Sequence, residues 1–81
     1  MKAQVRLFAI ARQLAGRDVV TVEVPEGATI ADLRTALHAA CPQLGAALRH
    51  MLFAVDADYA ADTTPLPPAA DIACIPPVSG G

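Results

Sequence analysis

The sequence predicts an α+β fold in which one main helix packs across a mixed sheet of about five strands. Three observations support this fold class. Short runs in which apolar and polar residues alternate, as in half-buried strands, occur near both ends of the chain. One longer segment between them repeats apolar residues at helical spacing. The chain has 81 residues, which is the length of a single small domain.

The N-terminal region is expected to form a strand followed by a short helix. Residues 4–9 alternate, with Val5, Leu7 and Ala9 set against Gln4, Arg6 and Phe8, and this period of two predicts a strand. Ile10 and Leu14 lie four residues apart, which predicts about two helical turns. Gly16 follows at the position where glycine commonly closes a helix.

The next region is expected to form a second strand and the main helix. Residues 20–24 alternate and end at Pro25, and the short connection makes this strand an antiparallel neighbour of the first. Thr29 is placed to cap the helix, with Asp32 three residues on completing a capping box. The helix stops before Pro42. Its buried stripe is expected to consist of Ile30, Leu33, Leu37 and Cys41.

The second half of the chain is expected to supply another short helix and three strands. In order, we expect a helix at residues 42–49 with Leu44 and Leu48 on one side, a strand at 51–55, a turn at 56–58, a brief strand from Tyr59, a loop at 63–70 and a last strand at 71–75. This order is that of a β-grasp, or ubiquitin-like, domain. We expect the domain to span residues 1–76 and a flexible C-terminal tail to span 77–81.

Composition excludes several classes of function. Six Lys and Arg face eight Asp and Glu, giving a net charge of −2, so we expect no nucleic-acid partner. The longest stretch without a charged residue, 35–48, is too short to cross a membrane. The N-terminus shows no export signal, and we expect a cytoplasmic protein. Cys41 and Cys74 have neither disulfide nor metal-ligand spacing, so we expect core thiols and no metal site.

The feature that carries chemistry is the C-terminal pair Gly80-Gly81. Residues without side chains adopt almost any backbone conformation, so they can thread a narrow channel in another protein. Pro76 and Pro77 would supply a stiff, extended lead-in. The reactive group would then be the main-chain carboxylate of Gly81, which must be activated before substitution, typically as an acyl adenylate made by a partner with ATP.

Three segments of the chain resemble a known family. They are the ending Ile75-Pro76-Pro77-Val78-Ser79-Gly80-Gly81, the opening Val5-Arg6-Leu7-Phe8-Ala9 and the helix start Pro25-Glu26-Gly27-Ala28-Thr29. They look like the small, sulfur-carrier subunits of molybdopterin synthase, within the ubiquitin-like β-grasp family. The likeness covers essentially the whole chain, and the tail is its most specific part.

The resemblance implies a sulfur carrier in molybdenum cofactor biosynthesis. An adenylyltransferase related to ubiquitin-activating enzymes would use ATP to adenylate Gly81, and a persulfide would convert it to a thiocarboxylate, 1-thioglycine. The tail, with Gly80 as its thin neck, would then enter the large catalytic subunit and give sulfur to cyclic pyranopterin monophosphate. The chain itself would bind no cofactor and would be non-catalytic alone, within a heterotetramer.

The resemblance also implies a partner surface. Phe8 and Ile75 are out of phase with the core residues of their strands, so we expect them on the outer face of the sheet. In the family, apolar residues at these positions and at Tyr59 face both partner proteins. Arg12 is a candidate charge at the rim. The expected partner-binding residues are Phe8, Tyr59, Ile75, Pro76, Pro77 and Val78.

Two departures from the family pattern and several alternatives remain. Ala69-Ala70 stands where relatives often have Gly-Asp, and Asp56 where they often have Asn, which concerns turn geometry.

The chain could instead carry sulfur for thiamine, a thiolated tRNA base or cysteine. It could also be a ubiquitin-like modifier that joins Gly81 to a lysine, or an interaction domain with an inert tail.

Overall fold

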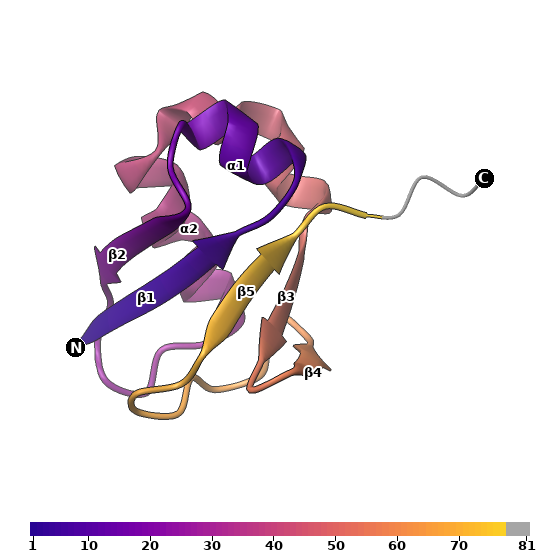
Figure 1. Ribbon diagram of the computed structural model, residues 1–81. Coiled ribbons are helices and arrows are strands. Elements are labelled where there is room, and N and C mark those ends of the chain that lie inside the picture. Colours follow the sequence, from indigo (N-terminus) through magenta and orange to yellow (C-terminus); the bar gives the residue numbers. More distant parts are fainter. Residues whose placement is uncertain (78–81) are drawn as a thin grey trace.

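The structure is a computed structural model that describes residues 1–77 and places five strands in one mixed sheet (Figure 1). The strand order is β2-β1-β5-β3-β4. Only β1 and β5 are parallel among these neighbours; the other pairs are antiparallel. The strands are β1 (Lys2–Leu7), β2 (Val19–Glu23), β3 (Leu52–Val55), β4 (Asp58–Ala60) and β5 (Ile72–Ile75). The predicted α+β class with a mixed five-stranded sheet is confirmed.

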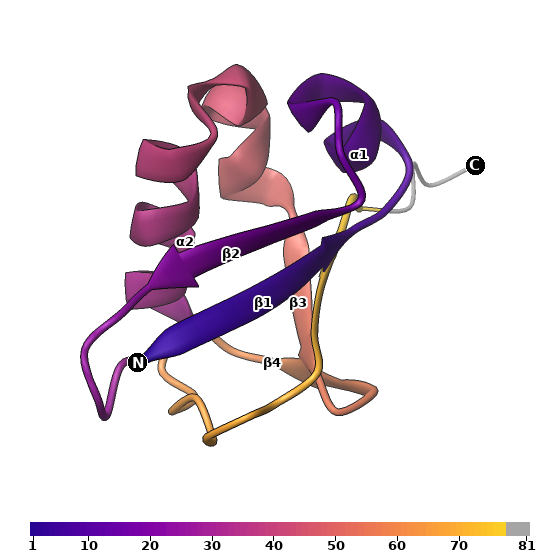
Figure 2. The same ribbon diagram turned by 60° about the vertical axis from the view of Figure 1, so that its left-hand side comes forward.

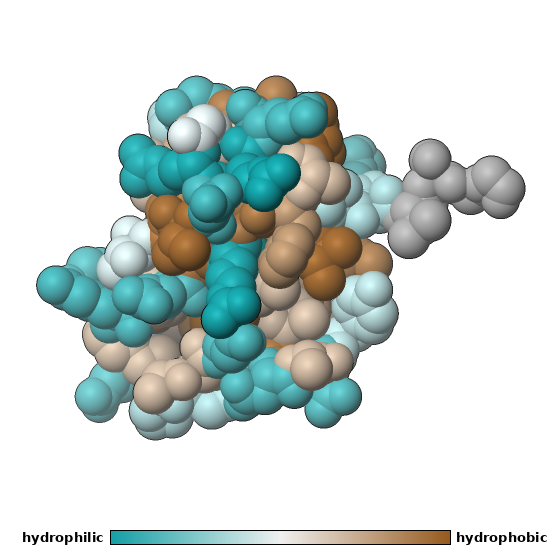
Figure 3. Space-filling view, in the orientation of Figure 1, coloured by the Kyte–Doolittle hydropathy of each residue, from teal (hydrophilic) through white to brown (hydrophobic). Residues whose placement is uncertain are grey.

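The helices cover one face of this sheet and one of its ends. They are α1 (Ile10–Ala15), α2 (Ile30–Ala40) and the 3₁₀ segment η1 (Pro42–His50). Figures 1 and 2 show α2 behind the sheet, with α1 and η1 together at the end where β1 finishes. The opposite face is open to solvent in the described chain. Figure 3 shows this open face, with brown patches on both sides of a teal strip.

The first strand follows the predicted alternation but ends earlier than expected. Val5 and Leu7 are buried, whereas Ala9 is exposed and lies outside the strand. Ala9 has φ 52° and ψ −126°, and Ala11 N–H donates to the Phe8 carbonyl at 3.1 Å. The chain therefore makes a tight turn that starts α1 directly after the strand. The strand was predicted to reach Ala9, but it ends at Leu7 because this turn interrupts the alternation.

Helix α1 ends where predicted but buries a different side. Gly16 adopts φ 74°, and its N–H donates to the Arg12 carbonyl, so the glycine cap is confirmed. Ile10 and Leu14 are exposed, while two alanines, Ala11 and Ala15, form the buried side. These small side chains let α1 lie close against η1, with which it is in contact. The spacing of Ile10 and Leu14 indicated the helix correctly but not its packed face.

Helix α2 confirms the prediction made from its cap and its stripe. Asp32 N–H donates to Thr29 Oγ1, and Thr29 N–H donates to Asp32 Oδ2, which completes the capping box. The helix ends at Ala40, just before Cys41 and Pro42. Its expected stripe of Ile30, Leu33, Leu37 and Cys41 is fully buried. The following segment, η1, is 3₁₀ and kinks at Gly45, although Leu44 and Leu48 are buried as expected.

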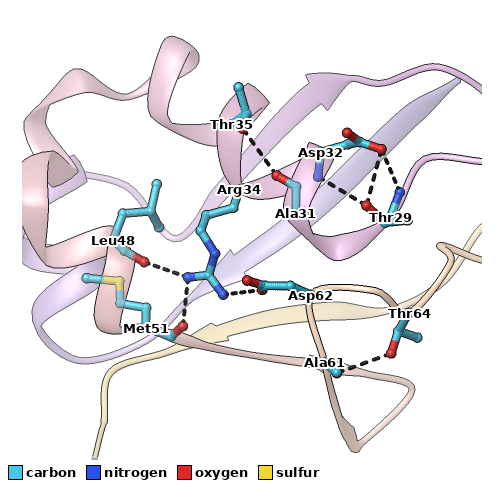
Figure 4. Close-up of polar contacts among 10 residues, drawn as sticks. All are labelled: Thr29, Ala31, Asp32, Arg34, Thr35, Leu48, Met51, Ala61, Asp62 and Thr64. Atoms are coloured by element: carbon cyan, nitrogen blue, oxygen red, sulfur yellow. Dashed lines mark hydrogen bonds and ion pairs between the residues drawn. The ribbon is translucent and has the colours of Figure 1, made fainter.

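The Arg34 side chain ties α2 to the rest of the domain (Figure 4). Its Nη1 donates to the carbonyl oxygens of Leu48 at 2.6 Å and Met51 at 2.9 Å, and its Nη2 pairs with Asp62 at 2.8 Å. The guanidinium also lies 4.9 Å from the centre of the Phe53 ring. A single cation thus binds two carbonyls at the end of η1, of which that of Leu48 also accepts from Met51 N–H at 3.2 Å.

Two turns place alanines in backbone conformations that favour glycine. Asp56 and Ala57 connect β3 to β4 with φ 50° and 73°, the geometry of a tight hairpin turn. Asp56 N–H donates to the Asp71 carbonyl, and Asp56 Oδ1 accepts from Asp71 N–H, so this turn holds the start of β5. Ala69, in the loop before β5, has φ 56°.

Replacing Ala57 by glycine is expected to stabilise the fold by about 0.5–1 kcal/mol, because glycine relieves the strain of a positive φ. The matched control is Ala36→Gly in the middle of α2, which is expected to destabilise by about 1 kcal/mol. Urea unfolding followed by circular dichroism measures both changes. A lower free energy of unfolding for Ala57→Gly would contradict the turn geometry.

Arg34→Met is expected to lower the free energy of unfolding by about 2–3 kcal/mol, since the Met51 carbonyl and Asp62 lose the guanidinium and the Leu48 carbonyl keeps only Met51 N–H. Methionine keeps an apolar stem of similar length, so lost packing contributes little. Arg49→Met, at an exposed position, serves as the control and is expected to stay within about 0.5 kcal/mol of the parent. Equal stabilities of the two variants would show that Arg34 is not a structural tie.

Candidate functional site

The last strand, β5, lies in the middle of the sheet and fixes where the chain leaves the domain. It pairs with β1 in parallel, with Leu7 opposite Cys74, and with β3 in antiparallel register, with Leu52 opposite Ile75. After Ile75 the chain leaves at the end of the sheet where α1 lies (Figure 1). Because strands hold β5 on both sides, residue 77 is reached at a defined point next to the open face.

The open face brings together the apolar residues that the sequence predicted for partner binding. Phe8 N–H donates to the Cys74 carbonyl at 3.2 Å, which sets Phe8 beside the end of β5. Phe8 and Tyr59 are 45% and 69% exposed, and Ile75 is half-buried. All three line one shallow groove of about 420 Å³. Its remaining lining consists of Arg6, Ala54, Ala57, Asp71 and Ala73.

Leu52 belongs to the same face and was missed by the sequence analysis. It is 44% exposed, and its pairing with Ile75 puts both side chains on the outer side of the sheet. The run from Met51 to Val55 is apolar throughout, so it gives no visible alternation. Met51 and Phe53 are both buried. Because successive side chains of a strand point to opposite faces, Leu52 between them points outward.

Charged residues contribute less to the groove than apolar ones. Arg6 Nε lies 3.3 Å from Asp71 Oδ1, and this exposed pair crosses the open face from β1 to the start of β5. An exposed pair of this kind adds little stability but leaves the face locally neutral. Arg12 pairs instead with Asp18 at 3.7 Å on the side of α1, and it does not line the groove.

Of the tail residues in the predicted site, the structure describes only Pro76 and Pro77. Pro76 is half-buried and Pro77 is exposed, directly after β5. Val78, Gly80 and Gly81 lie outside the described residues. The predicted roles of all these positions stay predictions.

The two cysteines are core residues, as predicted. Cys41 and Cys74 are free thiols and fully buried. Burial raises the pKa of the Cys74 thiol to about 11, an effect that the charge of Arg34 only partly offsets. Its Sγ lies 3.4 Å from Met51 Sδ, inside the core. A thiol with so high a pKa stays protonated at neutral pH and is a poor nucleophile.

Residues 1–77 hold no group of three His, Cys, Asp or Glu side chains placed as they would be around a metal ion. Within the same range, no helix has the length and apolar character needed to cross a membrane.

The groove beside the exit of the C-terminal segment is lined by exposed apolar side chains, which suits it to binding a second protein.

Comparison with known proteins agrees with this geometry. Residues 5–81 match the model of the ThiS family. Molybdopterin synthase sulfur carrier subunits from Chlamydomonas reinhardtii and Caenorhabditis briggsae are 35% and 36% identical to this chain, with 100% of this chain and 100% and 99% of the relatives covered. An Arabidopsis thaliana protein of the same name is 31% identical over 100% of this chain and 84% of its own length.

Solved structures give the same picture. SAMP1 from Haloferax volcanii superimposes with a TM-score of 0.86 at 30% identity, with 100% of both chains covered. A chain from the complex of subunits 1 and 2 of the Helicobacter pylori molybdopterin-converting factor gives 0.68 at 22% identity, again over 100% of both chains. The predicted β-grasp fold and the predicted family resemblance are confirmed. Since the family model spans residues 5–81, this chain belongs to the ThiS family.

Proposed function

We propose that this chain is the sulfur carrier subunit of molybdopterin synthase. The observation that carries the proposal is that curated relatives 31–36% identical over the whole of this chain bear that name. The Gly80-Gly81 ending supplies the reactive main-chain carboxylate that such a carrier needs. The apolar groove beside the exit of β5 supplies a surface on which a tail-accepting enzyme can dock.

Loading of Gly81 proceeds in three steps on partner enzymes. On an adenylyltransferase, a carboxylate oxygen of Gly81 attacks the α-phosphorus of ATP, and pyrophosphate leaves. A persulfide sulfur then attacks the acyl carbon and displaces AMP. A second thiol cleaves the resulting acyl disulfide, so that the thiocarboxylate is released and the two thiol sulfurs are left as a disulfide. Both ATP and the catalytic groups belong to the partners in this scheme.

Unloading takes place in the large catalytic subunit. The thiocarboxylate sulfur is transferred to cyclic pyranopterin monophosphate, and the glycine carboxylate is regenerated with an oxygen from water. The Helicobacter pylori chain of the same fold was solved together with subunit 2 of its factor, which supports a large-subunit partner here. We place the contact on the open face, where Phe8, Leu52 and Tyr59 expose apolar surface.

A protein modifier is the second candidate function. The structure of SAMP1, a small archaeal modifier protein, matches the whole chain at 30% identity. A modifier would join the same Gly81 carboxylate to a lysine amine of a target protein. Incubation with ATP, the activating enzyme and cell extract separates the candidates, because a modifier gives lysine-linked adducts whereas a carrier gives a thiocarboxylate.

Removal of Gly81 is expected to abolish sulfur loading and leave the fold unchanged. The chain is incubated with ATP, the adenylyltransferase and a persulfide donor, and its intact mass is measured. The parent chain should gain the mass difference between one sulfur and one oxygen, and the shortened chain should gain nothing. Loading of the shortened chain would show that sulfur is carried elsewhere. No gain by the parent chain in an active system would contradict the carrier function.

Phe8→Asp and Tyr59→Asp are each expected to weaken binding of the large subunit about 10- to 100-fold, because a charge is buried where apolar side chains dock. Ala39→Asp is the matched control. Ala39 is an exposed residue of α2, on the opposite face of the sheet from the groove, so this variant should bind like the parent. Isothermal titration calorimetry measures the affinities, and circular dichroism checks the fold. Unchanged affinity of both groove variants would place the interface on another surface.

A further inference from the structure

Charge is distributed unevenly along the strand direction of this domain. Two ion pairs, Arg6 with Asp71 and Arg34 with Asp62, are locally neutral. The other charged side chains separate between the two ends of the sheet. The end from which the tail leaves carries three arginines and one aspartate, a net charge of +2: Arg12, Arg17, Arg49 and Asp18.

The opposite end is acidic. Its side chains are one lysine and five carboxylates, a side-chain charge of −4, beside the N-terminal ammonium of Met1: Lys2, Glu23, Glu26, Asp32, Asp56 and Asp58. Strand register supports both assignments. In the register of β1 with β2, Lys2 lies opposite Glu23 at the end away from the tail. Arg6 lies opposite Val19, two residues after Arg17, at the end from which the tail leaves. The two ends together account for the net charge of −2 of the whole chain.

Two of the arginines at the tail end are available to a partner. Within residues 1–77, Arg17 and Arg49 form no ion pair, while Arg12 is engaged by Asp18. Both are exposed, and they come from two separate segments at this end of the sheet, the loop after α1 and the end of η1. Ile10 and Leu14 of α1 are exposed at the same end. The surface around the tail exit therefore combines apolar side chains with unpaired positive charge.

The distance between the two ends exceeds the range over which salt leaves charges unscreened, so an approaching protein interacts mainly with the nearer end. The six residues of β1 span about 20 Å, at roughly 3.3 Å per residue. The Debye length at physiological ionic strength is about 8 Å, so the acidic end is largely screened from a partner that approaches the tail. Such a partner experiences a positive surface although the chain as a whole is negative.

We propose that Arg17 and Arg49 steer the tail of this chain into a protein partner whose surface around the tail entrance is acidic. The partner's identity rests on the proposed function, under which it is the large subunit of the synthase. Complementary charges raise the rate of association more than they raise affinity. The apolar groove retains the partner after contact. During the approach, the positive charge at the tail end and the negative charge at the opposite end turn the domain so that its tail faces the partner.

The test is stopped-flow association of the loaded chain with the large subunit from the same organism. The variant R17E/R49E is expected to associate about tenfold more slowly at low salt, with a dissociation rate within about twofold of the parent. In about 1 M salt, where the Debye length is about 3 Å, parent and variant should associate at similar rates. Sulfur transfer within the preformed complex should proceed at the parental rate.

Two controls make the outcome specific. E26K/D58K changes the charge by the same magnitude in the opposite direction, at the acidic end, and should leave the association rate within about twofold. R17K/R49K keeps the charge and should associate like the parent. Parental association by R17E/R49E at low salt, or an acceleration by E26K/D58K as large as the slowing by R17E/R49E, would overturn the steering proposal alone. Failure of the parent chain to bind the large subunit at all would overturn both this proposal and the proposed function.

Discussion

The pairing of β5 between β1 and β3 is the constraint on which the rest of this structure depends. A strand at the edge would let the C-terminal segment start from a loosely held position. Here Ile72–Ile75 is hydrogen-bonded on both sides, so the segment that leads to Gly81 leaves from a fixed place. The same pairing sets Phe8 beside the end of β5 and Leu52 opposite Ile75, and Phe8 and Ile75 line the apolar groove next to that exit.

One face of the sheet is covered by helix α2, and the other is exposed. Helix α2 closes one face with its buried stripe, and Arg34 locks it to the carbonyls of Leu48 and Met51. The other face exposes Phe8 and Tyr59 in the described chain. A domain of this size can bury only about 60% of the surface of its unfolded chain. An apolar face left open is therefore compatible with stability and available to a partner, which would supply the catalytic cavity.

Much of this architecture could be predicted from local patterns, and the errors share one physical cause. The stripe of α2 and its Thr29 cap are local features of the sequence, and both were predicted correctly. The face of α1 and the outward position of Leu52 depend on packing and strand register, which are set by distant residues. Ala9 adopts a turn that its residue type does not indicate. For the site, Phe8 and Ile75 were predictable because their phase conflicted with the core.

Sulfur transfer from the loaded chain to the pterin precursor tests the central claim most directly. The thiocarboxylated chain is mixed with the large subunit and cyclic pyranopterin monophosphate, and both the dithiolene product and the intact mass of the chain are followed over time. The account predicts that product forms as the chain loses one sulfur and regains one oxygen. Product formation with the sulfur of the chain retained, or a loaded chain that stays inert in an active complex, would contradict it.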